Sequence, residues 1–170
     1  MSALNAFLRR PVAARLAPLG VGLAALLSVA LFLIYAGAAG VAPGFPLDDA
    51  WIHQTYARNL AHSGQWAYTP GVPSAGSTSP LWTLALSAGY LLRLPYRAWT
   101  LFLGWLALTG AAWAAMRLTR RLFPARPALP LLAGLFCALE WHLVWAAVSG
   151  METLLFCALA LTLLAEGIVA

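Results

Sequence analysis

The chain has 170 residues, of which 62% are hydrophobic and 9% are charged, and it carries a net charge of +5. These values exclude an ordinary soluble domain, because a soluble chain of this size has too little interior to bury so many apolar side chains. Every basic residue is an arginine, and the arginines cluster between apolar runs, so no soluble basic face exists that would bind nucleic acid. The composition predicts an all-α, polytopic membrane helix bundle, with residues 1–170 forming a single membrane domain.

The first apolar run predicts a membrane span over residues 16–39, because a helix needs about 20 apolar residues to cross a bilayer. A cleaved signal peptide is the alternative, since arginines precede the run and the small residues Ala36 and Ala38 end it. The apolar run is well beyond the roughly 7–15 residues of a signal-peptide core. This length favours an uncleaved span.

Three later apolar runs also predict spans, which gives about four spans in total. A further run, residues 80–92, is too short to cross a bilayer and has the length of an interfacial segment. Ser79 followed by Pro80 is a favourable helix start, with a capping residue and then proline at the first helical position. We therefore expect a juxtamembrane helix at residues 80–92 and spans at residues 98–116, 128–148 and 153–170.

Two arginine clusters set the expected orientation of the spans. Cytoplasmic loops are enriched in arginine, so an even number of spans must separate two cytoplasmic clusters. This condition holds if residues 80–92 do not cross the bilayer. The amino terminus is then cytoplasmic, residues 40–97 form a long external loop, and residues 149–153 form a short external turn. The clusters are Arg9, Arg10 and Arg15, and Arg117, Arg120, Arg121 and Arg126.

The external loop contains the polar stretch "LDDAWIHQTYARN". We expect Asp48 to cap a new helix and Asp49 to lie in its first turn, where the helix dipole favours a carboxylate. An open alternative is that both acids only start the helix. On this helix Asp49, His53 and Tyr56 share one face, because residues three and four apart are neighbours. Arg58 lies roughly opposite Asp49, where we expect it to contact lipid phosphate.

Three further ionisable residues lie in or beside the later spans. Glu140 and His142 fall within the third predicted span, and an ionisable group at such a depth is by default a functional hypothesis. We expect them either to line a wet cavity that opens toward Asp49 or to form an interhelical hydrogen-bonded pair. Glu152, in the second external turn, either caps the last span or binds a metal or substrate.

Three blocks, "DDAWIHQTYARNLA", "YTPGVPSAGSTSPLW" and "SGMETLLF", resemble in order and spacing the amino-terminal part of polyprenyl-phosphate-sugar-dependent glycosyltransferases of the GT-C fold. The chain is most similar to bacterial proteins related to protein mannosyltransferases and arabinofuranosyltransferases. Such enzymes place one acidic motif in the first external loop and another acidic residue in the next. The resemblance implies a multi-pass protein of the bacterial plasma membrane that acts on the cell envelope.

The resemblance implies transfer of a sugar from a polyprenyl-phosphate donor to an acceptor hydroxyl on the external face. A partly desolvated Asp49, with Asp48 beside it, would take the hydroxyl proton, because the phosphate leaving group needs no acid. Alternatively, Asp49 and Glu152 would hold Mg²⁺ or Mn²⁺, which prefer oxygen ligands. The residues implied in substrate binding are His53, Tyr56, Arg58, Glu140 and His142.

The chain resembles only about the first third of these enzymes, so we expect it to be their amino-terminal part or a truncated form. The alternative is a non-catalytic small membrane subunit that packs, among membrane lipids, against further subunits of a larger complex. A transporter is disfavoured, because the acids are expected outside the bilayer and not at its midplane.

Overall fold

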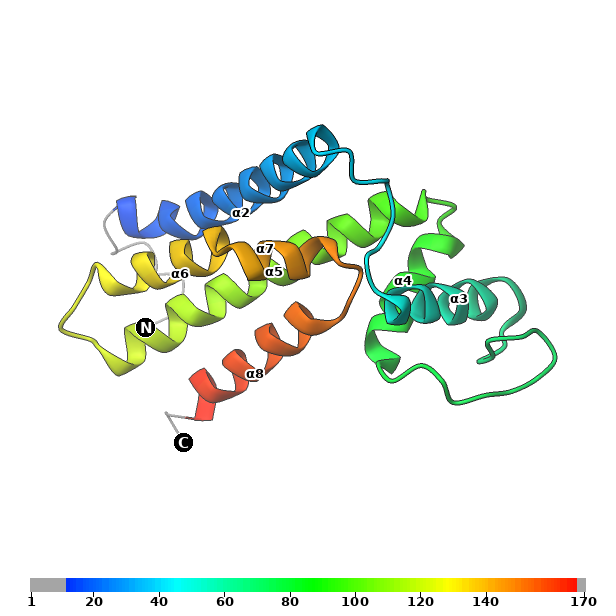
Figure 1. Ribbon diagram of the computed structural model, residues 1–170. Helices are drawn as coiled ribbons and strands as arrows, with labels where there is room; N and C mark the ends of the chain where they lie inside the picture. The colour runs from blue at the N-terminus through cyan, green and yellow to red at the C-terminus, as the bar shows by residue number, and fades with distance from the viewer. Residues whose placement is uncertain (1–11, 168–170) are drawn as a thin grey trace.

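The computed structural model describes residues 12–167, which form helices joined by turns and one ordered loop (Figure 1). No β-strand occurs within these residues, so the predicted all-α class is confirmed. The helices are α2 (Val12–Ala38), α3 (Asp48–Ser63), α4 (Pro80–Leu91), α5 (Tyr96–Leu122), α6 (Leu129–Leu139), α7 (Trp141–Val148) and α8 (Thr153–Gly167).

Helix α5 lies at the centre of the bundle and packs against α2, α6, α7 and α8. Small residues let the helices approach closely: a Cβ atom added to Gly104 of α5 would overlap the carbonyl oxygen of Ala147 in α7. Close packing of this kind holds helices together where lipid removes the hydrophobic drive for association. The buried core includes Val21, Leu108, Met116, Ala138 and Leu154.

Two helices are long and apolar enough to cross a membrane, namely Leu16–Ala38 and Tyr96–Leu122. Helices α6 and α7 pass this test only as a pair, bent by 53° at their junction, so the count is two or three. The 15 residues of α8 extend about 22 Å, less than the roughly 30 Å hydrocarbon core. The prediction of four spans is therefore wrong for the described part of the chain. Residues 168–170, at the end of the expected fourth span, lie outside it.

The second span is longer at both ends than predicted. The sequence predicts this span at residues 98–116, yet the flanking Arg97 and Arg117 also lie on α5, which continues through the arginine-rich stretch to Leu122. Long arginine stems pack along apolar surface while the guanidinium reaches water, so an arginine need not end a membrane helix.

Helices α3 and α4 pack against each other at one end of the bundle (Figure 1). The carboxyl end of α2, the amino end of α5 and the turn between α7 and α8 lie at this same end. The carboxyl end of α5 and the start of α6 lie at the other. The segments predicted to be external, residues 40–97 and 149–153, thus share one end of the bundle. Arg9 and Arg10 lie outside the described residues.

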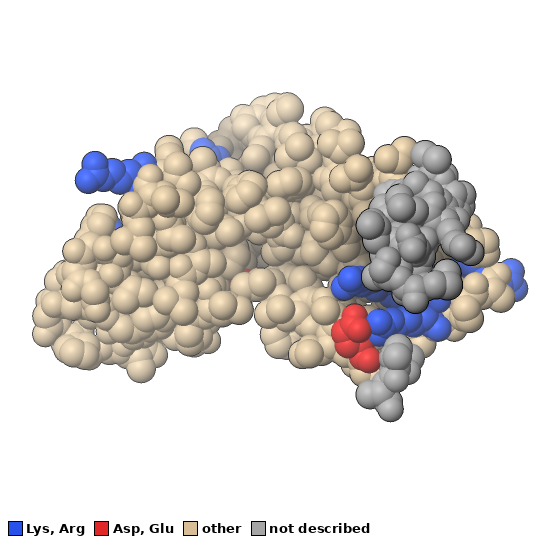
Figure 2. Space-filling view, turned by 180° about the vertical axis from the view of Figure 1, so that it is seen from behind, with Lys and Arg blue, Asp and Glu red and all other residues tan. Residues whose placement is uncertain are grey.

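Charged side chains gather at the two ends of the molecule, with a broad uncharged surface between them (Figure 2). At the end away from α3, Arg121 Nη2 contacts Glu166 Oε2 at 2.8 Å, which joins α5 to α8. This distribution is the one expected of helices that lie in a bilayer with charged ends in the headgroup regions.

The helix predicted at residues 80–92 forms over Pro80–Leu91, almost residue for residue. Helix α4 has Ser79 at its N-cap and Pro80 as its first residue, although no side chain caps its backbone. Its 12 residues extend about 18 Å, too short to span a bilayer. The Nε1 of the buried Trp82 donates a 2.9 Å hydrogen bond to the carbonyl oxygen of Gly150 and so ties α4 to the α7–α8 turn.

Candidate functional site

The two aspartates lie in the first turn of α3 and are exposed. The N-cap is Leu47, in extended conformation, so the expectation that Asp48 caps the helix is wrong. Trp51 Nε1 donates a 3.2 Å hydrogen bond to the carbonyl oxygen of Phe45, which links the preceding segment to the first turn of α3. Within the described residues, no hydrogen bond or ion pair holds the carboxylate of Asp48 or Asp49. Asp49 is therefore exposed to solvent, whereas a partly desolvated carboxylate was expected from the sequence.

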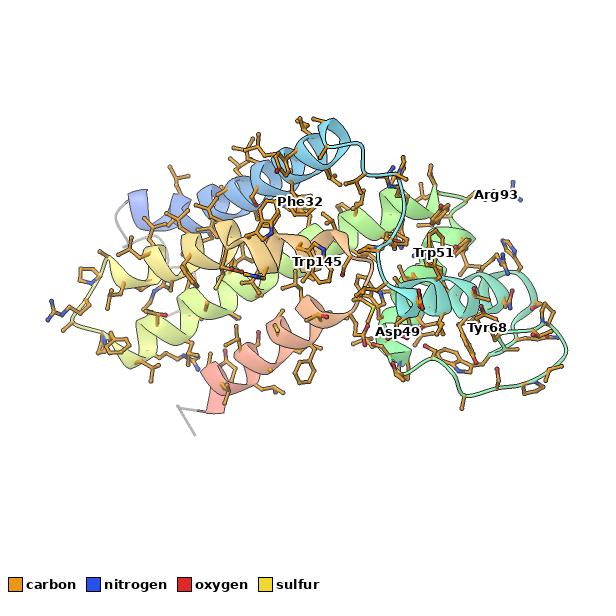
Figure 3. All side chains as sticks on the ribbon, viewed as in Figure 1. Phe32, Asp49, Trp51, Tyr68, Arg93 and Trp145 are labelled. Carbon is orange, nitrogen blue, oxygen red and sulfur yellow. The ribbon has the colours of Figure 1, made fainter. Side chains whose placement is uncertain are left out.

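The amino end of α3 packs directly on the α7–α8 turn. Gly150 has a φ of +84°, and a Cβ atom at this position would lie 2.9 Å from Ala50 Cβ and 2.8 Å from Phe45. Only glycine suits both the left-handed conformation and the close approach. Figure 3 shows Asp49 at the end of α3 that faces this turn. The first acidic motif and the second external turn therefore meet.

His53 and Glu152 make the side-chain contact between these two segments. His53 Nε2 lies 3.3 Å from Glu152 Oε2, and the two side chains are 1% and 25% exposed. The two atoms are close but misaligned, so neither has a hydrogen-bond partner within the described residues. Both atoms are buried and face each other.

A chain of hydroxyl groups contacts the second ring nitrogen of His53. Ser77 Oγ lies 3.0 Å from His53 Nδ1, and Thr83 Oγ1 lies 2.7 Å from Ser77 Oγ. A proton on Nε2 turns repulsion between two lone pairs into attraction toward the Glu152 carboxylate. Nδ1 then accepts from Ser77, and Ser77 accepts from Thr83. This chain links α3, the ordered loop, α4 and the α7–α8 turn.

Tyr56 lies on the same face of α3 but supports the loop of residues 64–79. It is 1% exposed, its hydroxyl contacts Ser74 Oγ, and Gly76 N–H donates to it at 2.8 Å. Burial thus leaves little of the His53 or Tyr56 side chain for a bound molecule to contact, and their role in substrate binding stays a prediction. Arg58 is exposed on α3, as its place opposite Asp49 predicts.

A second buried network was not found by reading the sequence. Gln54 Nε2 donates to Thr100 Oγ1 at 2.7 Å, and Tyr90 donates to Gln54 Oε1 at 2.9 Å. Burial raises the pKa of the Tyr90 hydroxyl, against the lowering effect of Arg58, so Tyr90 stays a donor. These bonds fix α3 to α4 and α5. The sequence indicated this network only through Gln54, a polar residue next to His53 in an amphipathic helix.

Glu140 and His142 do not join this site. Glu140 ends α6 and caps α7, where its Oε2 accepts a 2.9 Å hydrogen bond from Leu143 N–H. Its Oε1 lies 2.7 Å from Nδ1 of His142, whose side chain is 88% exposed. The pair is local and not interhelical, and the eight residues of α7, about 12 Å, separate it from the α7–α8 turn.

An open groove of about 450 Å³ lies beside Glu152, between α4 and α8. Its polar residues come from the starts of the two helices, and its apolar residues continue along α8. The main contributors are Thr78, Ser79, Leu81, Glu152, Phe156 and Leu159. Glu152 thus lies where the polar end of the groove meets the His53 contact.

The binding of Mg²⁺ or Mn²⁺ by Asp49 and Glu152 stays a prediction. The described residues contain no group of three or more His, Cys, Asp or Glu side chains that could hold a metal ion. A metal held by Asp49 and Glu152 would therefore take its remaining ligands from elsewhere than a third such side chain among these residues.

The chain matches no protein-family model, no curated protein and no solved structure.

Proposed function

We propose that this chain is the membrane module of a GT-C-like glycosyltransferase, which transfers a sugar from a polyprenyl-phosphate donor to an acceptor hydroxyl on the external face. The observation that carries the proposal is the 3.3 Å contact between His53 and Glu152. Through it the acidic start of α3 and the acidic α7–α8 turn lie at one end of the bundle. The same pair of acidic positions underlies the resemblance of the sequence to this class of enzyme.

Asp49 is the proposed general base. Its carboxylate is exposed and has no hydrogen bond or ion pair within the described residues, so it is available to a bound acceptor. The acceptor oxygen attacks the anomeric carbon as the bond to the phosphate oxygen breaks. Asp49 takes the hydroxyl proton, and the phosphate leaves as an anion.

Arg97 is the proposed partner of the donor phosphate. It lies at the start of α5, at the mouth of a groove of about 500 Å³ between α2, α5 and α7. Phe32 and Trp145 are among the apolar residues that line this groove (Figure 3). A guanidinium group over an apolar groove suits an anionic lipid, because it binds phosphate while the chain stays in hydrocarbon.

The test is a transfer assay with the full-length protein in lipid nanodiscs, supplied with a panel of polyprenyl-phosphate hexoses and pentoses. Asp49→Asn is expected to lower the rate at least about 100-fold, because it removes a general base. Glu166→Gln, at the opposite end of the bundle, is the matched control and should leave the rate unchanged. Membrane insertion should be the same in all variants.

Full activity of Asp49→Asn would refute the assignment of the base. A wild-type protein that transfers no sugar from any donor, but copurifies with a larger membrane assembly, would instead support the alternative of a non-catalytic subunit.

A further inference from the structure

Resting on the proposed function, we infer that the groove between α4 and α8 is the acceptor site, and that the acceptor is a neutral, hydroxyl-bearing amphiphile whose hydroxyl group binds Glu152. The groove has a volume of about 450 Å³, enough for a sugar-sized head and part of an alkyl chain. It is distinct from the groove at Arg97, which lies on the other side of the bundle core, between α2, α5 and α7.

The chemistry of the polar end selects a hydroxyl group. The Glu152 side chain lines the groove and is 25% exposed, and because its Oε2 is buried against His53, the other carboxylate oxygen is the one that can meet a ligand. Thr78 and Ser79 line the same end and add hydroxyl groups. A carboxylate accepts hydrogen bonds from hydroxyl donors and repels phosphate. The charge of Glu152 therefore separates this site from that of the anionic donor.

His53 determines how Glu152 is held. The imidazole is 1% exposed, so it is not a ligand-binding group itself, but its Nε2 points to Glu152 from behind. Ser77 and Thr83 fix the ring from its other side. A buried histidine held in this way fixes one oxygen of the carboxylate and so leaves the other oxygen for the groove. His53 is a positioning residue of this site.

The apolar wall of the groove identifies the rest of the ligand. Phe156 and Leu159 lie one and two turns beyond Glu152 on α8, and they are 70% and 47% exposed. Helix α8 runs from the α3 end of the bundle toward the opposite end (Figure 1). An alkyl chain bound here would lie along the helix axis, with its hydroxyl head at the same end as Asp49. Such a ligand reaches the groove sideways from the bilayer.

The experiment uses the full-length protein in phosphatidylcholine nanodiscs and a dodecyl glucoside that carries a diazirine in its alkyl chain. After irradiation, cross-linked peptides are mapped by mass spectrometry. Cross-links are expected at residues 78–81 and 153–159. Unlabelled dodecyl glucoside should compete, whereas dodecyl phosphate, with the same chain and an anionic head, should not.

Two variants have matched controls. Glu152→Gln is expected to lower cross-linking about tenfold, the value of one charge-assisted hydrogen bond, and Glu166→Gln should not change it. Phe156→Ala should lower it about fivefold through lost apolar contact. Phe136→Ala, at a phenylalanine of α6 with the same exposure, should not: the two rings are 70% and 69% exposed.

Cross-links spread evenly over the exposed apolar helices, or equal competition by dodecyl phosphate, would overturn the acceptor site. The binding readout does not depend on transfer. If cross-linking depends on Glu152 but the protein has no transferase activity, the groove would still be a binding site for hydroxyl-bearing amphiphiles. The proposed glycosyltransferase function would then be refuted. If the protein transfers sugar but no cross-link forms in the groove, the acceptor site would be refuted and the proposed function would stand.

Discussion

The contact between His53 and Glu152 is expected to contribute measurably to folding stability. His53→Phe keeps a planar ring of similar size but removes both ring nitrogens. Ser77 would lose one of its two hydrogen-bond partners, and the Glu152 carboxylate would lose the donor 3.3 Å away. One neutral hydrogen bond is worth about 1 kcal/mol, and an interaction with a mostly buried charge about 1–2 kcal/mol. We therefore expect His53→Phe to lower the free energy of unfolding by about 2–3 kcal/mol.

A double-mutant cycle isolates the pair. His53→Phe and Glu152→Gln, singly and together, are compared by equilibrium unfolding in mixed detergent and lipid micelles. The expected coupling energy is about 1–2 kcal/mol. The same substitutions at His142 and Glu140 form the control cycle, because His142 is 88% exposed and its ion pair should couple by less than about 0.5 kcal/mol. Additive effects at His53 and Glu152 would contradict the proposed link between α3 and the α7–α8 turn.

Two further predictions concern the bundle. Gly104→Ala should lower the free energy of unfolding by about 2 kcal/mol, because the new Cβ overlaps the Ala147 carbonyl oxygen. Gly110→Ala on the same helix should be neutral or stabilising, since its Cβ would be 3.6 Å from the nearest atom. Equal losses of stability in the two variants would argue against the close approach of α5 and α7. Glu140→Ala should cost about 1 kcal/mol through loss of the α7 cap, whereas Glu140→Gln, which keeps an acceptor, should cost less; identical losses would exclude capping.

Charge and length predicted much of the architecture. The arginine clusters and the shortness of residues 80–92 placed the two acidic segments at one end, and the structure brings them together there. The break at Glu140 was not predictable from hydropathy, because residues 128–148 form one apolar run. Helix α6 ends where Glu140 adopts an extended backbone conformation, and the hydrogen bond from Leu143 N–H to the Glu140 side chain then caps α7.

The sequence predicted which residues of the candidate site share a helix face, but not which segments cover them. Helical periodicity correctly indicated that Asp49, His53 and Tyr56 share a face of α3. It did not reveal that the loop of residues 64–79 and α4 cover the last two, because periodicity says which side chains are neighbours and not what lies over them. The partner of His53, Glu152, is far away in sequence and is brought close by the glycine turn at Gly150.

Sidedness is tested most directly by labelling single cysteines at positions 49, 152 and 122 in intact cells, with Cys137 and Cys157 replaced by alanine. A membrane-impermeant maleimide should react with Asp49→Cys and Glu152→Cys from outside. Leu122→Cys, at the far end of α5, should react only after permeabilisation. Reaction of positions 49 and 152 from opposite sides of the membrane would contradict a shared external site.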